Sequence, residues 1–187
     1  MTLTIFHEAP TLDVLLEPHR ATIGADFAGY RNHCLRVLSY ALHFADEPSD
    51  ADRQALEVAL AFHDIALWTD RALAYLEPSE ALATRENEAR GLGVDPQLLR
   101  DLIHWHHKAT PFRGPRADLV NALRKGDWVD ATKGTFRKGL RRKDIRAVEA
   151  ALPNEGFHDA LQRLAGDNNE GKTLGGLWKV TAGILKW

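Results

Sequence analysis

Residues 59–64 read Ala-Leu-Ala-Phe-His-Asp, so a histidine and an aspartate stand at the end of an apolar helical run. The helix is expected to start at Ser49 or Asp50 and to run to His63. An ionised carboxylate such as Asp64 is costly in apolar surroundings unless it has a partner. A divalent cation supplies that partner, and imidazole beside carboxylate is an ordinary mixed ligand set. This stretch therefore predicts a buried helix end that binds a metal ion.

Helical periodicity continues along most of the chain, and no sustained alternation of the strand kind interrupts it. Further helices are expected at residues 11–16, 27–44, 79–90, 96–107, 118–132, 141–152 and 157–165. Loops are expected at 66–78, where the chain could form a lid, and at 110–115. Residues 166–176 are glycine-rich and predict a flexible connection to a short C-terminal helix. The prediction is an all-α, single-domain helical bundle over residues 1–187.

Composition narrows the class of protein. The 187 residues are 44% hydrophobic and 27% charged, the balance of a soluble globular chain. The formal net charge of -2 argues against nucleic acid or an anionic membrane as the partner of the whole molecule. No apolar run approaches the roughly 18 residues that span a bilayer, and the N-terminus does not resemble a signal peptide. A single cysteine, Cys34, fits a reducing compartment, so a cytoplasmic location is expected.

Two other predicted helices carry residues of the same chemistry. His33 lies in Tyr-Arg-Asn-His-Cys-Leu-Arg-Val-Leu, residues 30–38, and Asp127 lies in the apolar helix that ends near 132. Asp130 competes with Asp127, because the two aspartates are three residues apart. Ligand sites inside helical proteins are built from side chains on facing helices, so three helices could converge on one ion.

The order of His33, then His63-Asp64, then Asp127 resembles the signature of the HD superfamily of metal-dependent phosphohydrolases. The steps, about thirty and then about sixty residues, are also similar. Residues 24–33, Gly-Ala-Asp-Phe-Ala-Gly-Tyr-Arg-Asn-His, resemble the lead-in of many small bacterial HD proteins. The resemblance covers roughly residues 20–135, which would form the metal-binding core of an HD-type domain, with C-terminal helices over 136–187. It implies that His33, His63, Asp64 and Asp127 are the metal ligands, with Asp127 preferred to Asp130.

The implied function is hydrolysis of a phosphomonoester or nucleotide-like phosphate. A divalent ion would lower the pKa of a bound water and polarise a phosphoryl oxygen, and Asp64 would take part in catalysis. Two histidines and two carboxylates leave positions open for water and substrate, unlike the thiolate-rich sites of structural zinc. Manganese, iron, cobalt, nickel and magnesium all remain open as the one ion expected.

A histidine cluster, Leu-Ile-His-Trp-His-His-Lys at residues 102–108, is the third candidate group. His104 and His107 share a helix face, whereas His106 is expected to point elsewhere. His106-His107 resembles the late histidine pair of two-metal relatives such as the HD-GYP group. The intermediate histidine of that group is absent near Asn87 and Glu88. One metal ion is therefore favoured, a second is left open, and His104 and His107 are assigned to catalysis beside the substrate.

Cationic groups are needed to bind a phosphate. The predicted substrate-binding residues are Arg31, Lys108 and Lys125. A basic run over residues 133–146 either borders the site or forms a solvated helix face. Loops 66–78 and 108–116 are expected to shape the pocket, with Trp68, Trp105 and Trp128 as walls and Tyr30 facing the metal or simply packing. The general acid stays open among Asp70, Glu86, Glu88 and the histidine cluster.

Two alternatives remain. One is a different metal chemistry on an HD-type scaffold, either a di-iron oxygenase or a hydratase. The other is a non-catalytic regulatory module that keeps its metal for structure and contacts RNA through the basic run. The expected partner is a small phosphorylated substrate, not a membrane; nucleic acid is disfavoured, and the oligomeric state, a dimer included, is open.

Overall fold

The computed structural model describes residues 3–45, 47–71 and 73–167, and these residues form helices and connecting turns without a strand. The helices are α1 (Pro10–Leu16), η1 (Glu17–His19), α2 (Arg20–Ile23), η2 (Gly24–Asp26), α3 (Phe27–Phe44), α4 (Asp50–Phe62), α5 (Ala66–Thr69), α6 (Leu76–Ala89), α7 (Pro96–Trp105), α8 (Ala117–Ala131), α9 (Arg142–Ala151) and α10 (Phe157–Asp167). The all-α prediction is confirmed. None of the described helices combines the length and apolar composition needed to cross a bilayer.

The largest departure from the predicted elements is at residues 66–78, which were expected to form a loop. Here α5 begins at Ala66, two residues after Asp64, and α6 begins at Leu76. Pro78 suggested a break, but it occupies the first turn of α6, where proline costs little because its missing N–H would have no partner within the helix. The predicted C-terminal helix lies outside the described residues.

Short turns of helix over residues 17–26 were also not predicted. Pro18 suggested the end of the first helix, yet η1, α2 and η2 follow one another and lead directly into α3. Pro18 is tolerated because it lies at the start of η1, and Gly24, at a φ of 64°, lets the chain change direction between α2 and η2. The chain therefore reaches α3 through a helical segment and not through a loop.

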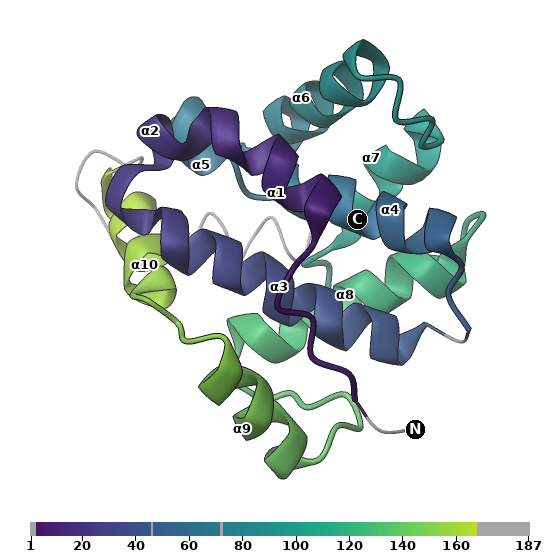
Figure 1. Cartoon of the computed structure of the whole chain (residues 1–187), viewed down its shortest axis with the longest axis vertical. Coiled ribbons are helices and arrows are strands. Elements are labelled where there is room, and N and C mark those ends of the chain that lie inside the picture. Colours follow the sequence, from purple (N-terminus) through teal and green to yellow (C-terminus); the bar gives the residue numbers. More distant parts are fainter. Residues whose placement is uncertain (1–2, 46, 72, 168–187) are drawn as a thin grey trace.

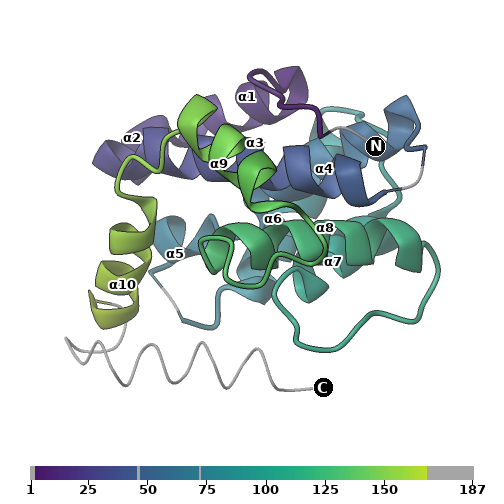
Figure 2. The same ribbon diagram turned by 90° about the horizontal axis from the view of Figure 1, so that it is seen from below.

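The helices pack in two layers, which Figure 2 shows from below: α1 to α4 lie above, and α5 to α8 lie beneath them. Helix α10 stands at one end of both layers, and α9 lies at the bottom of the view in Figure 1. The most extensive contact between two helices joins α3 to α8, while α1 packs on α4 and α6 on α7. The metal-site candidates lie on α3, on α8 and directly after α4, so this packing brings them together.

Local sequence signals explain where α4 and α7 begin. The Ser49 side chain accepts from the Asp52 backbone N–H, and the Asp52 carboxylate accepts from the Ser49 backbone N–H, a reciprocal capping box. Asp95 caps α7 by accepting from two backbone N–H groups, and Pro96 occupies its first position. The capping box sets the residue at which α4 begins. His63 and Asp64 directly follow the other end of this helix, so their position in the core depends on where the helix starts.

Gly126 sets how closely α3 and α8 approach. A Cβ added at this position would lie 2.9 Å from the Val37 carbonyl oxygen and 3.1 Å from the Ala41 backbone nitrogen. The contact is made by backbone atoms, which cannot move aside as a flexible side chain can. Asp127, the next residue, is therefore held against α3 because position 126 has no side chain.

Gly126→Ala is expected to lower the free energy of unfolding by about 1–3 kcal/mol, the usual cost of overpacking a core. Alanine has a better intrinsic helix propensity than glycine by up to about 1 kcal/mol, so any net loss reports the clash between the two helices. Urea denaturation followed by circular dichroism measures the change. A variant as stable as the wild type, or more stable, would contradict the close packing of α3 on α8.

Candidate metal centre

Four buried side chains from three helices meet at one point. His33 comes from α3, His63 is the C-cap residue of α4, Asp64 follows it, and Asp127 comes from α8. The Nε2 atoms of His33 and His63 are 3.0 Å apart. Asp64 Oδ2 lies 3.3 Å from His63 Nε2, and Asp127 Oδ1 lies 3.7 Å from His33 Nε2. All four are at most 7% exposed, so water cannot solvate their charges.

These separations fit a metal ion. Side-chain donor atoms of His33, His63 and Asp64 all lie within 4.8 Å of one another. Metal–ligand bonds of about 2.0–2.2 Å place neighbouring ligand atoms roughly 3 Å apart, close to the distances in this cluster. Asp64 and Asp127 pair with no lysine or arginine within the described part of the chain, and their ion-pair partners there are histidines. The donor set is therefore short of positive charge.

Hydrogen bonds at the far side of each imidazole aim its Nε2 atom at the cluster. His33 Nδ1 donates to Asp130 Oδ2 at 2.7 Å, and His63 Nδ1 donates to the Leu60 carbonyl oxygen at 2.8 Å. In the neutral form, both Nε2 atoms then carry lone pairs, and two lone pairs facing each other at 3.0 Å repel. A cation shared between the two nitrogens, either a metal ion or the proton that His63 carries when it is charged, turns this repulsion into attraction.

The pKa shifts follow from burial and charge. Burial raises the pKa of Asp127 above its usual value despite the nearby histidines. Burial also disfavours the charged form of Asp64, but the charges and hydrogen bonds of His63 and His106 outweigh it and hold this pKa well below the usual range. Burial lowers the pKa of His63, and the Asp64 carboxylate more than compensates, raising it to about 9. The protein's own groups thus disfavour the ionised form of Asp127. A metal ion bound beside this carboxylate would favour the ionised form.

Asp130 lies one step outside the cluster. Its carboxylate accepts from His33 and from Arg36, whose Nε and Nη2 atoms are 2.5 and 2.8 Å from Oδ1 and Oδ2. Burial on its own would raise the pKa of Asp130. The hydrogen bonds from Arg36 and His33 lower the pKa by more than burial raises it, so the net pKa lies below the usual value and the carboxylate stays ionised. A carboxylate behind a histidine fixes the tautomer and orientation of a metal ligand. Of the two competing aspartates, the structure places Asp127 in the cluster and Asp130 behind His33.

His106 was expected to point away, and the structure places it at the cluster instead. Its Nε2 atom is 3.4 Å from Asp64 Oδ1, the oxygen that does not contact His63. His107 Nδ1 lies 3.0 Å from the same His106 atom and 3.2 Å from the Tyr75 hydroxyl. The expectation assumed a helix through residue 107, but α7 ends at Trp105. Beyond that residue the three-residue periodicity no longer decides which way a side chain points.

His104 is not brought to the cluster. Its Nδ1 atom is 2.9 Å from Glu80 Oε1 on α6, and its side chain is 41% exposed. The three-residue spacing of His104 and His107 predicted that both side chains share one helix face. This prediction does not hold, because α7 ends at Trp105, between the two histidines. The predicted catalytic role of His104 has no support in this geometry, whereas His107 remains a candidate.

A matched pair of variants separates the two histidines. His106→Ala is expected to weaken binding of Mn²⁺ by about 10–100-fold, the usual effect of removing a partner of a metal-ligating group. His104→Ala is expected to leave the affinity within about twofold, because its partner is Glu80. Titration of chelator-treated protein with Mn²⁺ measures both, and the reverse order of effects would contradict the assignment.

A cavity of about 180 Å³ opens onto the cluster. His33, Asp64, His106, His107 and Asp127 form its polar side. The remaining wall is mainly apolar and comes from the segment after α4, from α8 and from α10: Leu67, Leu73, Tyr75, Ala131, Leu161 and Ala165. The predicted contribution of residues 66–78 is therefore present. Residues 108–116 do not line this cavity, and α10, which the prediction omitted, takes their place.

The predicted phosphate-binding cations are mostly elsewhere. Arg31 donates to both carboxylate oxygens of Asp13, at 2.6 and 2.9 Å. Lys125 lies over the Phe44 ring, 5.6 Å from its centroid. Lys108 alone among the three acts on the site: it is buried, and its charge adds to burial and to His106 in holding the pKa of His107 well below the usual value. Arg31 and Lys125 do not line the cavity.

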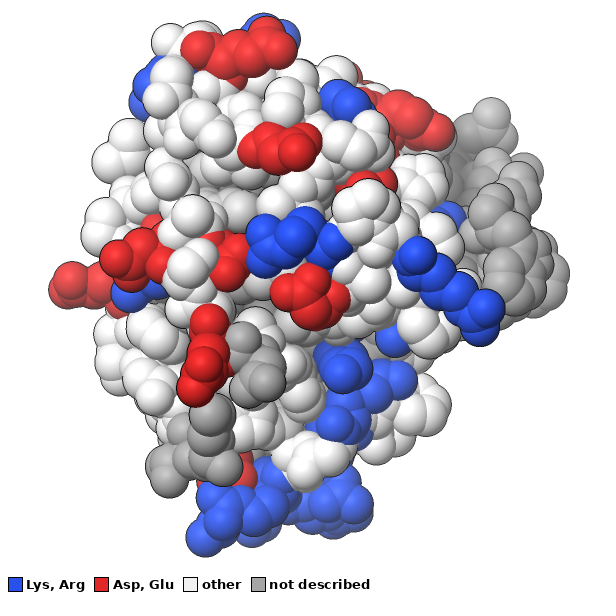
Figure 3. Space-filling model, turned by 90° about the vertical axis from the view of Figure 1, so that its right-hand side faces the viewer, with Lys and Arg blue, Asp and Glu red and all other residues white. Residues whose placement is uncertain are grey.

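The basic run at residues 133–146 also does not line the cavity. Its residues occupy the connection after α8 and the first turns of α9. Figure 3 shows lysine and arginine side chains gathered at the lower end of the molecule, the level at which α9 lies in Figure 1. The run is thus a surface feature, separate from the metal centre.

The three tryptophans expected to wall the pocket, Trp68, Trp105 and Trp128, do not line the cavity. Trp68 packs on Tyr30 in a tilted arrangement with ring centroids 4.9 Å apart, and Trp105 and Trp128 each contact a phenylalanine. Tyr30 in turn lies beside the rings of His33 and His63. Tyr30 therefore packs beside both imidazole rings. None of the three acidic residues considered for the general acid, namely Asp70, Glu86 and Glu88, lines the cavity.

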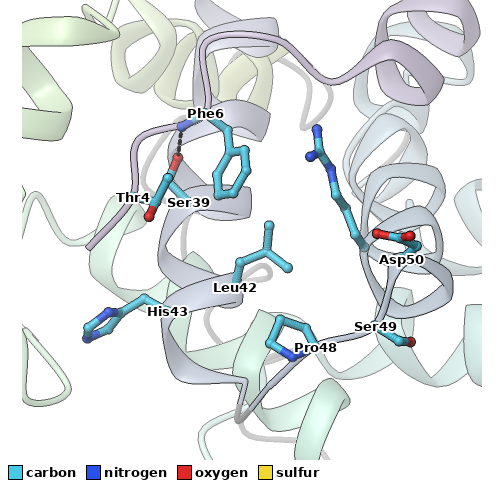
Figure 4. A pocket seen from close by; sticks show the side chains of 9 residues that line it. Thr4, Phe6, Ser39, Leu42, His43, Pro48, Ser49 and Asp50 are labelled. Atoms are coloured by element: carbon cyan, nitrogen blue, oxygen red, sulfur yellow. Dashed lines mark hydrogen bonds between the residues drawn. The ribbon is translucent and has the colours of Figure 1, made fainter. Parts of the chain in front are cut away.

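A second pocket, of about 220 Å³, lies between the N-terminal segment, the end of α3 and the start of α4 (Figure 4). Phe6, Leu42 and Pro48 contribute apolar surface to it. Its arginine, Arg53, donates to Glu57 and lies over the Phe6 ring. This pocket holds none of the predicted site residues and gathers no set of reactive groups.

One comparison with known proteins bears on this geometry. A family model described as HD domain matches residues 30–149, a range that includes all four cluster residues, from His33 to Asp127. No curated protein and no solved structure matches the chain. The matched range covers more than half of the sequence and runs from α3 into α9.

Proposed function

Since the chain belongs to the HD domain family, we propose that it hydrolyses a phosphorylated small molecule with one divalent metal ion held by His33, His63, Asp64 and Asp127. One observation carries the proposal. The Nε2 atoms of two histidines lie 3.0 Å apart beside two buried carboxylates whose ion-pair partners among the described residues are histidines, and three of these four side chains, those of His33, Asp64 and Asp127, line one cavity.

The residues around the cluster have separable tasks. A divalent ion bound there would polarise a phosphoryl oxygen and lower the pKa of a bound water. Asp130 and Arg36 hold the His33 ring in the orientation that ligation needs. His107 lines the cavity, and its lowered pKa keeps it neutral near pH 7, so it can accept a hydrogen bond there.

The cavity limits the substrate. Its volume of about 180 Å³ and its apolar wall of Leu67, Leu73 and Leu161 suit a compact phosphomonoester better than a large polyanion. Of the three predicted phosphate-binding cations, Lys108 is the one whose charge affects a residue of the site, His107. Because one lysine offsets only part of the charge of a phosphate, the metal ion would neutralise most of it.

The test is a metal-resolved screen for phosphate release. Chelator-treated protein is reloaded separately with manganese, iron, cobalt, nickel or magnesium and assayed on a panel of phosphomonoesters and nucleotides. The proposal expects release from at least one substrate with at least one metal, and none after chelation. If fully metallated protein releases no phosphate across the panel, the hydrolase proposal is wrong.

A second candidate is a two-metal chemistry, such as that of a di-iron oxygenase. The observation in its favour is that the two oxygens of Asp64 face different histidines, His63 and His106. Two irons per chain together with an absorption band of oxidised iron would favour it. One colourless ion per chain would exclude it. If the protein binds a metal ion but shows neither phosphate release nor two-metal chemistry, it is a regulatory module that holds the metal without turnover.

A further inference from the structure

A compact set of cations covers the loop after α8 and the start of α9; we call it the basic surface. It consists of Lys133, Arg137, Lys138, Arg141, Arg142, Lys143 and Arg146, together with the ring of Phe136. Residues 133–146 hold seven of the 24 basic residues of the chain and one of its 26 acidic residues. The chain as a whole therefore carries a small net charge, whereas this segment is strongly positive.

These cations are available to a partner. All seven are exposed, and only Arg141 pairs with the one acid of the segment, Asp144, at 2.6 and 3.0 Å. The other six make no ion pair with any residue that the structure describes. Partial burial and the charges of Arg124 and Lys125 lower the pKa of Lys138, as expected where positive charges gather.

An aromatic ring stands among the charges. Phe136 is 53% exposed, and the only other large hydrophobic residue that is exposed in the described chain is Val14. The ring meets Trp128 edge-on at 5.6 Å, and Lys138 Nζ lies 5.7 Å from its centroid. The Phe136 backbone N–H donates to the Thr132 hydroxyl, so the loop presents the ring in a fixed place.

We propose that the basic surface binds single-stranded nucleic acid, with its lysines and arginines on the phosphates and a base stacked on Phe136. Phosphates spaced along a strand complement cations spaced along a loop and a helix. The ring distinguishes this partner from an acidic protein or an anionic membrane, because an unpaired base offers a flat face for stacking. A net charge of -2 does not oppose this binding, because charges beyond about 10 Å are largely screened at physiological salt.

The inference does not rest on the metal centre, since none of these residues lines its cavity. Binding is measured by fluorescence anisotropy on the full chain, with a labelled oligouridylate and a labelled oligothymidylate of twelve nucleotides. The expected dissociation constant is of the order of micromolar at 50 mM salt, rising steeply by 200 mM. The RNA and DNA probes together show whether the sugar matters.

Two variants of the basic surface test the two kinds of contact. Phe136→Ala is expected to weaken binding by roughly 5–150-fold, the range measured for loss of one stacked base. Arg142→Gln combined with Arg146→Gln is expected to weaken binding and to reduce the salt dependence by about one unit of slope for each lost phosphate contact. Arg85→Gln, the same change at an exposed position on α6, is the matched control and should bind as the wild type does.

Three outcomes would overturn the proposal. The first is no anisotropy change at 50 mM salt with either oligonucleotide. The second is undiminished binding by Phe136→Ala, with its fold verified by circular dichroism, because the surface would then attract any polyanion. The third is tighter binding to polyglutamate or to phosphatidylglycerol vesicles than to both oligonucleotides, which would assign the surface to an acidic protein or a membrane.

Discussion

Asp64→Ala is expected to weaken binding of a divalent ion by at least about a hundredfold and to lower metal-dependent phosphate release by at least as much. The carboxylate lies 3.3 Å from His63 and 3.4 Å from His106, so its loss removes negative charge from the middle of the cluster. Binding free energies of roughly 10–16 kcal/mol for four-ligand zinc sites correspond to about 2.5–4 kcal/mol for each ligand. Isothermal titration with Mn²⁺ measures the affinity, and the phosphate-release assay measures the activity.

Asp118→Ala is the matched control for this prediction, because it removes a carboxylate from the exposed first turn of α8. It should retain the affinity and activity of the wild type. Asp64→Asn tests the role of charge, since the amide keeps one oxygen donor while losing the negative charge, and it should fall between the two. Activity that survives Asp64→Ala at saturating metal would refute the role given to this carboxylate.

Arg36→Met is expected to lower the free energy of unfolding by about 3–5 kcal/mol, the cost of leaving one partner of a buried ion pair alone. Arg36 is 1% exposed, and its guanidinium donates to Asp130 on α8 and to the carbonyl oxygens of Leu152 and Pro153 after α9. It therefore connects α3 to two other parts of the fold. Urea denaturation measures the loss, and a change of less than about 1 kcal/mol would contradict this account.

A double variant separates the stability of this pair from its effect on His33. Arg36→Met combined with Asp130→Leu replaces both charges with apolar groups, a change that is often neutral for stability. We expect it to recover most of the stability lost in Arg36→Met. It should still bind Mn²⁺ about 10–100-fold more weakly than the wild type, because His33 has lost the acceptor at Nδ1. Recovery of both properties would mean that Asp130 does not position His33.

The sequence predicted the parts of the site that lie on long periodic helices. His33 and Asp127 occupy α3 and α8, where apolar spacing defines the buried face, and His63 with Asp64 follows a helix whose start is set by its capping box. Asp130 shares that buried face with Asp127, so periodicity could not separate the two. The two aspartates differ because Arg36 binds Asp130, and this contact joins positions that are 94 residues apart in the sequence.

The predictions failed where helices end. His106 and His107 lie just past the end of α7, and the direction of a side chain there depends on a turn that no short-range signal defined. The apolar wall from α10 could not be foreseen, because Leu161 and Ala165 reach the cavity only through tertiary packing. Arg31 and Lys125 were chosen by charge and sequence position alone, and each contacts a partner outside the cavity.

The central claim is that three helices bring four side chains to one cation, and counting bound ions tests it most directly. Chelator-treated protein is titrated with Mn²⁺ while the electron paramagnetic resonance signal of free Mn²⁺ is followed, for the wild type and for alanine variants of His33, His63, Asp64 and Asp127. The account predicts one tightly bound ion per chain in the wild type, weakened in all four variants and retained in His104→Ala. A folded wild type that takes up no ion, or variants at His33 and Asp127 that bind as the wild type does, would contradict it.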